Sequence, residues 1–60
     1  MNIELKNGKT QNTTFIGDIQ QLKNEVYIIL TNGTKYLESK FDTVDEAKAR
    51  REELIEFLKY

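Results

Sequence analysis

The dipeptide Asn32-Gly33 constrains the fold of this 60-residue chain more than any other feature, because it separates two runs of β-forming residues, 26–31 and 34–41. Asn and Gly tolerate the two positive φ angles of a type I′ turn, so the pattern predicts a two-residue β-hairpin. Stepping outward from this turn, the predicted register pairs Thr31 with Thr34, Leu30 with Lys35, Ile29 with Tyr36, Ile28 with Leu37, Tyr27 with Glu38, Val26 with Ser39 and Glu25 with Lys40.

Two further β segments precede this hairpin. Residues 2–6 alternate polar and apolar side chains and end at the turn signal Asn7-Gly8. Residues 13–22 form a second β-rich run, in which Gly17 indicates a bulge or a close approach of another chain segment, and the dipeptide Lys23-Asn24 is a weaker turn signal. The first 41 residues therefore predict an antiparallel meander.

A helix is expected to follow, because the hydroxyl of Thr43 is placed to cap the amide of Glu46 while Glu46 reaches back in a capping box. At about 100° per residue, one stripe of this helix is apolar. Its members are Val44, Ala47, Leu54, Ile55 and Leu58. The chain is thus predicted to be one α+β domain over residues 1–60, a three- to four-stranded antiparallel β-meander packed on one C-terminal α-helix, with strands at about 2–6, 13–22, 25–31 and 34–41 and the helix at about 43–59.

The predicted register divides the sheet into two faces. The face assigned to the core carries Val26, Ile28, Leu30, Leu37 and Phe41, extended by Phe15 and Ile19. No second helix is left to cover the opposite face, so apolar side chains are exposed there, and such patches tend to mark interaction sites. The candidate interaction surface consists of Ile16, Tyr27, Ile29, Tyr36, Glu38 and Lys40. The alternative is structural, since cross-strand aromatic and β-branched pairs stabilise an open sheet by themselves.

Three residues of the predicted helix have two interpretations each. Arg51 falls near the centre of the apolar stripe, so its stem is expected to pack on the sheet while its guanidinium anchors at the rim or meets a carboxylate. The functional alternative for Arg51 is a contact with an anion or a partner. Phe57 and Tyr60 lie off the stripe, where they either pack under the first strand or form a secondary partner contact.

The composition of the chain argues against most kinds of catalytic site. The chain contains neither Cys nor His, and its only serine, Ser39, is expected to face the core, so no nucleophile lies beside a base. The carboxylates Asp42, Asp45 and Glu46 lack the spacing of an ion-wrapping loop and are interpreted as helix-capping charges rather than as a metal site. We therefore expect no enzyme, no catalytic residues, no metal site, no cofactor and no small-molecule substrate.

The charge balance and the start of the chain bear on partners and location. Ten acidic and nine basic residues give a net charge of −1, so the chain has no global field to attract a polyanion. The N-terminal segment lacks the basic start and long apolar run of a signal peptide, and the longest apolar stretch, residues 26–30, is far too short to span a membrane. A cytoplasmic protein with no membrane partner is expected.

The tract from Tyr36-Leu37 through Phe41-Asp42-Thr43-Val44-Asp45-Glu46-Ala47 resembles the end of the third strand and the helix start of the AP2/integrase-arm DNA-binding family, and the resemblance extends over residues 26–60. It implies a three-stranded sheet with one packed helix, whose open face enters the major groove through Arg and Trp. The corresponding positions here are Tyr27, Ile29, Tyr36, Glu38 and Lys40, with no Arg or Trp among them. The short, cysteine-free chain also resembles small proteins of unknown function encoded by phages and prophages.

Two functions are consistent with these observations. The first is a small non-enzymatic protein-interaction or homodimerising module that uses the uncovered sheet face. The alternative is an AP2/integrase-arm-like DNA-binding domain that uses the same face. An apolar centre with mixed charges favours a protein partner or a second copy, whereas a basic stripe around the face would favour DNA.

Overall fold

The computed structural model describes residues 2–58, and within them the chain forms an α+β fold. The elements in chain order are β1 (Asn2–Glu4), β2 (Thr10–Asn12), the 3-10 helix η1 (Thr13–Phe15), β3 (Ile16–Leu22), β4 (Glu25–Leu30), β5 (Lys35–Lys40) and α1 (Val44–Leu58). The predicted fold class is therefore confirmed, although strand β2 has no counterpart in the prediction.

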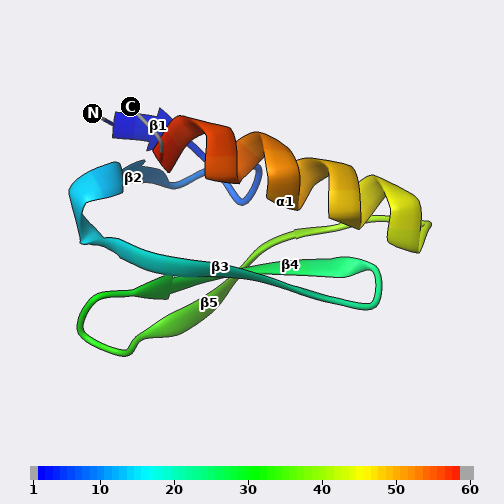
Figure 1. Cartoon of the computed structure of the whole chain (residues 1–60), viewed down its shortest axis with the longest axis horizontal. Helices are drawn as coiled ribbons and strands as arrows, with labels where there is room; N and C mark the ends of the chain where they lie inside the picture. Colours follow the sequence, from blue (N-terminus) through cyan, green and yellow to red (C-terminus); the bar gives the residue numbers. More distant parts are fainter. Residues whose placement is uncertain (1, 59–60) are drawn as a thin grey trace.

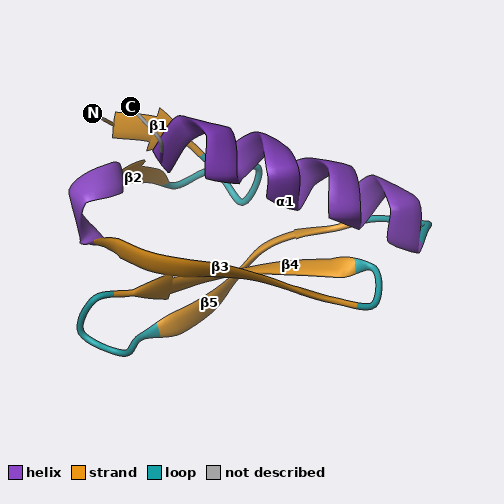
Figure 2. Cartoon of the chain, in the orientation of Figure 1, coloured by secondary structure: helices purple, strands orange, loops and turns teal. Residues whose placement is uncertain are grey.

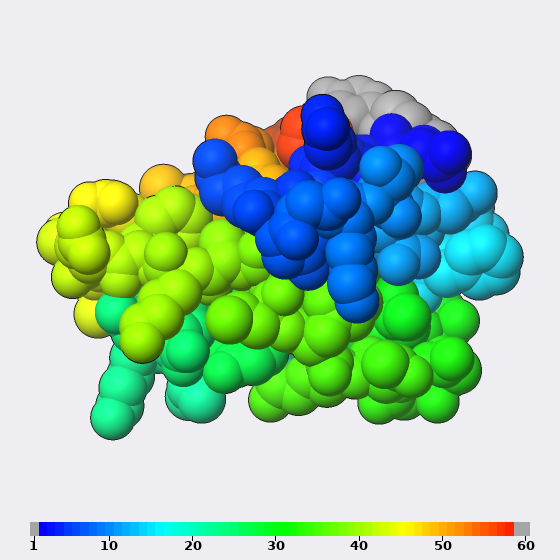
Figure 3. Space-filling view, turned by 180° about the vertical axis from the view of Figure 1, so that it is seen from behind, coloured from blue at the N-terminus to red at the C-terminus, as the bar shows by residue number. Residues whose placement is uncertain are grey.

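The strands form two antiparallel sheets (Figure 1). Strands β3, β4 and β5 make a three-stranded meander in sequential order, while β1 and β2 pair only with each other. Figure 2 shows that α1 and the β1–β2 hairpin lie on the same side of the three-stranded sheet, and the view from behind shows the N-terminal segment in front of α1 and above the strands (Figure 3). The first strand thus covers the sheet rather than extending it.

The Asn32-Gly33 turn differs from the predicted type I′ hairpin. Gly33 has a φ of 91°, whereas Asn32 has no positive φ. The loop contains three residues, because the Leu30 N–H donates to the Thr34 carbonyl (2.8 Å) and the Gly33 N–H donates to the Leu30 carbonyl (2.9 Å). This pattern is that of a type I turn followed by a left-handed glycine. The predicted two-residue type I′ turn is therefore wrong, because the loop is one residue longer.

The longer loop shifts the pairing of β4 with β5 by one residue. Ile28 lies opposite Tyr36 and Tyr27 lies opposite Leu37, whereas the predicted partners were Leu37 and Glu38. Glu38 then forms a β-bulge, an extra residue that restores the predicted pairs Val26–Ser39 and Glu25–Lys40. Since one residue of slip exchanges the faces of a strand, Tyr36 turns toward the covered face and Leu37 turns away from it.

A second bulge lies in β3, where Gly17 has no partner between the pairs Ile16–Leu30 and Asp18–Ile29. Gly17 was predicted as a bulge or close approach, and the bulge is confirmed. It changes which neighbouring side chain enters the core: Ile16 is buried, and Phe15 is 56% exposed. The assignment of Phe15 to the core and of Ile16 to the opposite face was wrong for this reason.

Helix α1 begins as predicted, since the Glu46 N–H donates to Oγ1 of Thr43 (3.2 Å). Its buried residues are Ala47, Arg50 and Leu54, whereas Val44, predicted on the apolar stripe, is 50% exposed. The helix closes a thin core under one face of the sheet. The buried apolar residues of that core are Ile3, Leu5, Ile16, Ile19, Val26, Ile28, Ala47 and Leu54.

Candidate interaction surface

The sheet face opposite α1 has no element of the described chain over it, and we call it the open face (Figure 1). Directly paired residues on neighbouring strands point to the same side, so the register fixes its members. They form three rows across β3, β4 and β5: Asp18, Ile29 and Lys35; Gln20, Tyr27 and Leu37; and Leu22, Glu25 and Lys40. Four apolar or aromatic side chains thus lie among five polar or charged ones.

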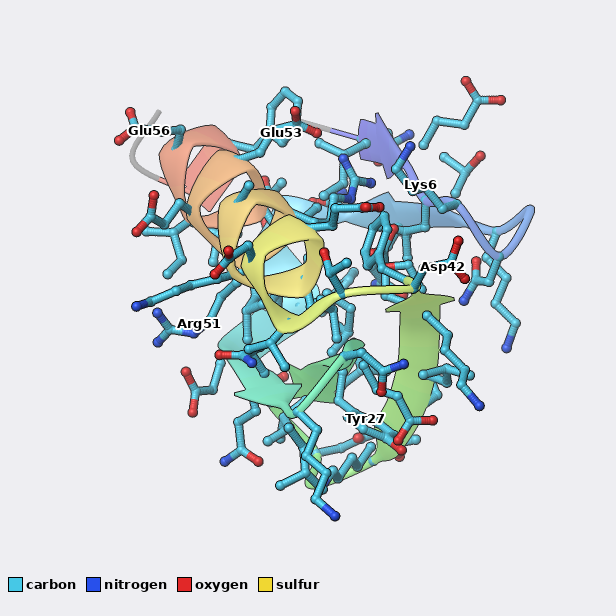
Figure 4. The ribbon with its side chains drawn as sticks, turned by 90° about the vertical axis from the view of Figure 1, so that its right-hand side faces the viewer. Lys6, Tyr27, Asp42, Arg51, Glu53 and Glu56 are labelled. Carbon is cyan, nitrogen blue, oxygen red and sulfur yellow. The ribbon has the colours of Figure 1, made fainter. Side chains whose placement is uncertain are left out.

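The apolar part of the open face is accessible. Leu22 is 56% exposed and Leu37 is 41% exposed, while Tyr27 and Ile29 on the central strand are half-buried. Figure 4 shows Tyr27 on the side of the sheet away from the helix. Apolar side chains on three adjacent strands form a continuous surface of the kind that marks interaction sites.

Tyr27 is held in place by its charged neighbours. The Lys35 ammonium lies 4.8 Å from the centre of the Tyr27 ring, and the Tyr27 hydroxyl donates to Oε1 of Glu25 at 3.2 Å. Desolvation and the nearby Glu25 carboxylate, which also accepts the hydroxyl hydrogen bond, raise the pKa of the Tyr27 phenol above its ordinary value. The centre of the open face therefore has a fixed aromatic ring rather than a freely rotating one.

The edges of the sheet are blocked at their middle positions. On β3, the Ile19 N–H donates to Oδ1 of Asp18 (2.8 Å) and the Ile19 carbonyl accepts from Nε of Arg51 (3.1 Å). On β5, the Leu37 carbonyl accepts from Nδ2 of Asn7 (3.0 Å). An unpaired edge is what an added strand needs, and side-chain hydrogen bonds at these positions compete with it. The middle positions of both edges are accordingly less open to an added strand than the rest of the sheet.

Glu38 lies on the covered side, in a buried ion pair with Arg50. The Glu38 carboxylate is 1% exposed and accepts from Nε (3.2 Å) and Nη2 (2.8 Å) of Arg50, from the Lys6 N–H (2.8 Å) and from Oγ of Ser39 (2.6 Å). Arg50 also donates to Glu53. These contacts join the β1–β2 loop, the bulge of β5 and α1.

Four hydrogen bonds to the Glu38 carboxylate favour its ionised form. Burial alone would raise the pKa of Glu38, but the hydrogen bonds from Arg50, from the Lys6 N–H and from Ser39, together with the Arg50 charge, outweigh burial and lower it. The same pair raises the pKa of Arg50, because hydrogen bonding to Glu38 outweighs desolvation. The pair is thus ionised and fully satisfied, which is the chemistry of a structural contact rather than of a catalytic acid.

The structure divides the six residues of the predicted interaction surface. Tyr27, Ile29 and Lys40 lie on the open face as predicted. Ile16 is buried because of the Gly17 bulge, and Glu38 is buried because of its own bulge and its pairing with Arg50. These two placements correct the prediction.

Tyr36 is the third correction. Its hydroxyl donates to Oε1 of Gln11 (3.2 Å) and its ring lies 4.8 Å from the Lys9 ammonium, so it packs against the β1–β2 hairpin on the covered side. Leu37 takes its place on the open face. Sequence reasoning missed Leu37 because the three-residue loop has the same Asn-Gly signal as the two-residue one.

The remaining predicted residues lie elsewhere. Arg51 is half-buried at the rim, bonded to the edge strand and on the opposite side of α1 from Lys6 (Figure 4). Phe57 is 37% exposed on α1, and Tyr60 lies outside the described residues. Arg50 was missed, although its position three residues after Ala47 and four before Leu54 places it on their stripe.

Acidic clusters and surface hollows are the remaining features of the described residues. No group of three or more acidic side chains within residues 2–58 is arranged to hold a metal ion. A shallow hollow of about 400 Å³ lies between β3 and α1, where Lys35, Lys48 and Arg51 mix with Asp18 and Glu52. Its lining thus carries charges of both signs.

Comparison with known protein families, curated proteins and solved structures finds no match to this chain. The resemblance to the AP2/integrase-arm family therefore stays a prediction. Within residues 2–58, α1 is neither long enough nor apolar enough to cross a membrane.

Proposed function

We propose that this chain is a small non-enzymatic protein-binding module that uses the open face of its three-stranded sheet. The observation that supports the proposal is the exposure of Leu22 and Leu37 beside Tyr27 and Ile29, on the one sheet face that α1 and the β1–β2 hairpin leave uncovered. Residues of this type at the centre, with charges at the margin, match the anatomy of protein interfaces.

The fixed position of Tyr27 supports the same proposal. An aromatic ring that is already ordered by Lys35 and Glu25 loses little conformational freedom when a partner packs on it. Aromatic side chains of this kind are enriched among the residues that dominate binding energy. The open face thus has a preorganised anchor.

DNA binding through this face has less support. The open face carries the acids Asp18 and Glu25 beside the bases Lys35 and Lys40, so its charges balance. Phosphate contacts by Lys and Arg supply most of the affinity of proteins for DNA, and an equal number of carboxylates opposes them. Protein is therefore the proposed partner.

Site-specific photocrosslinking in cells that express the protein tests the proposal. A photoreactive phenylalanine analogue placed at Leu37 is expected to give a protein adduct, which mass spectrometry identifies. The same analogue at Val44, an equally exposed apolar residue on α1, serves as the matched control and is expected to give none. An adduct with a second copy of the chain counts as protein binding.

The adduct must then be reproduced with purified components. We expect Ile29→Lys to leave the melting temperature within a few degrees of wild type while removing binding of the identified protein, because Ile29 lies on the central strand of the open face, next to Tyr27. Equal adducts from Leu37 and Val44, or undiminished binding by Ile29→Lys, would contradict the proposal.

A further inference from the structure

The charges of the open face are separated by strand. On this face β3 contributes Asp18 and no base, whereas β5 contributes Lys35 and Lys40 and no acid. The two outer strands flank the aromatic centre on β4, so the face has an acidic side and a basic side. A surface with this polarity is complementary to itself when it is rotated by half a turn.

We propose that the open face binds a second copy of the same chain, with the twofold axis running along β4. This inference rests on the proposed function and names its partner. Rotation about an axis parallel to the strands places β3 of one copy over β5 of the other, while β4 lies over its own copy. Asp18 then faces Lys35 of the second copy, and symmetry makes this contact twice.

The rest of the register fits the same axis. Gln20 lies over Leu37 of the second copy, Leu22 lies over the stem of Lys40, and Tyr27 and Ile29 meet their own copies at the centre. Two packed sheets keep their mean strand directions within about 30° of each other, a range that includes the parallel alignment of β4 with its copy on this axis. The apolar core of such an interface is formed by residues that are exposed or half-buried in the single chain.

The other twofold arrangement is less favourable. An axis perpendicular to the strands would place β3 over β3 and β5 over β5, with the order of the rows reversed. Lys35 would then face Lys40 of the second copy, and the Glu25 carboxylate would lie over Ile29. Like charges in contact and an unpaired carboxylate over an apolar side chain both oppose binding.

One contact of the proposed dimer opposes it. Glu25 meets its own copy on the twofold axis, in the last row of the sheet, next to the turn at Lys23-Asn24 and beside Lys40 of its own chain. Water reaches this end of the face, which weakens the repulsion. The open face has nine side chains, fewer than the roughly 20–30 residues per partner of a standard interface, so we expect a dissociation constant well above the nanomolar range.

Reversing and then exchanging the charges of Asp18 and Lys35 tests the direction of the twofold axis. Sedimentation equilibrium from micromolar to millimolar protein is expected to show a reversible wild-type dimer. Each of Asp18→Lys and Lys35→Glu should weaken it by about tenfold or more, because each variant places two like-charge pairs in the interface. The double variant Asp18→Lys/Lys35→Glu should restore the dimer, since it exchanges the charges of the contact without removing it.

Two more variants complete the test. Lys48→Glu, which reverses a charge on the helix, should leave the dissociation constant unchanged, and Glu25→Gln should tighten the dimer by removing the like-charge contact on the axis. Thermal melting of each variant at a concentration where the wild type is monomeric separates loss of association from loss of folding, which matters for Asp18 because its carboxylate also accepts the Ile19 N–H.

The outcomes distinguish the two proposals. A wild-type chain that stays monomeric at millimolar concentration overturns the symmetric dimer, and an adduct from Leu37 with a different protein would still support a binding module. A dimer that Ile29→Lys removes but that the Asp18 and Lys35 reversals leave unchanged overturns the proposed axis alone. Failure of the double variant to recover, with its melting temperature intact, also overturns the axis.

Discussion

On the covered face of the three-stranded sheet, Val26 and Ile28 are fully buried, whereas their neighbours on the open face, Tyr27 and Ile29, are only half-buried beside the exposed Leu37. The two faces are formed by the same strands, so local β propensity cannot explain the difference. What separates them is that α1 and the β1–β2 hairpin pack on one side only. In a chain this short, one face supplies the core and no element of the described residues is left to cover the other.

The polar groups of the two faces differ in the same way. The covered side contains Glu38 and Arg50, whose charges are excluded from water and satisfied by four hydrogen bonds to one carboxylate. The open side contains Asp18, Lys35 and Lys40, which remain in contact with solvent. Charges on the first side hold separate elements together, whereas Asp18 and Lys35 on the second side contact neighbouring groups of the same sheet.

The largest effect is expected from breaking the buried ion pair. Arg50→Met should lower the free energy of unfolding by about 3–5 kcal/mol, because it leaves the Glu38 carboxylate buried without its charge partner. The double variant Glu38→Leu/Arg50→Met should recover most of this loss, since no charge is then left uncompensated. Chemical denaturation of both variants checks the prediction, and a cost below about 1 kcal/mol for the single variant would show that water reaches the pair.

Neighbouring residues on β4 provide the direct test of the two faces. Ile28→Ala should cost about 2–5 kcal/mol, because Ile28 is 0% exposed and its removal leaves a cavity under α1. Ile29→Ala, one residue later on the open face, should cost well under half as much in a monomeric sample. Equal costs in denaturant titrations would mean that the open face is packed as tightly as the covered one.

A smaller decrease in the free energy of unfolding is expected at low pH. Because the pKa of Glu38 is lowered in the folded chain, its ionised pair stabilises the fold above the unfolded value of 4.5, and this stability is lost as the pH falls through the lowered folded pKa. The free energy of unfolding should therefore decrease below about pH 4.5, and this part of the decrease should be absent from Glu38→Leu/Arg50→Met. Denaturation at a series of pH values compares the two chains. If both chains lost the same free energy of unfolding at low pH, the decrease would come from carboxylates other than Glu38.

The smallest effect concerns the start of the helix that covers the core. Thr43→Ala should cost about 1 kcal/mol, because the Glu46 amide loses its side-chain acceptor. Thr43→Ser keeps the hydroxyl and is the matched control, expected to stay close to wild type. A melting curve for the alanine variant that overlays the wild type would show that water replaces the cap.

The bulge at Gly17 and the two Asn-Gly turns show what a local sequence signal can and cannot predict. Gly17 could be interpreted in advance because a glycine inside a strand is a local signal, and the register does shift there. The Asn-Gly turns show its limit. Both Asn7-Gly8 and Asn32-Gly33 adopt the same three-residue loop, in which the Asn side chain accepts a hydrogen bond two residues onward, yet the dipeptide alone also suits a two-residue turn.

The sequence by itself determined the order of the main elements, the helix start at Thr43, an irregularity at Gly17 and the predicted α+β class, because each depends on residues close together in the chain. Only the tertiary structure decided which side chains of β5 face outward. The bulge at Glu38 accommodates a carboxylate that must reach Arg50, 12 residues away, and the Lys6 amide, 32 residues away. No local pattern encodes that requirement, since a buried charge is stable only where distant elements bring its partners together.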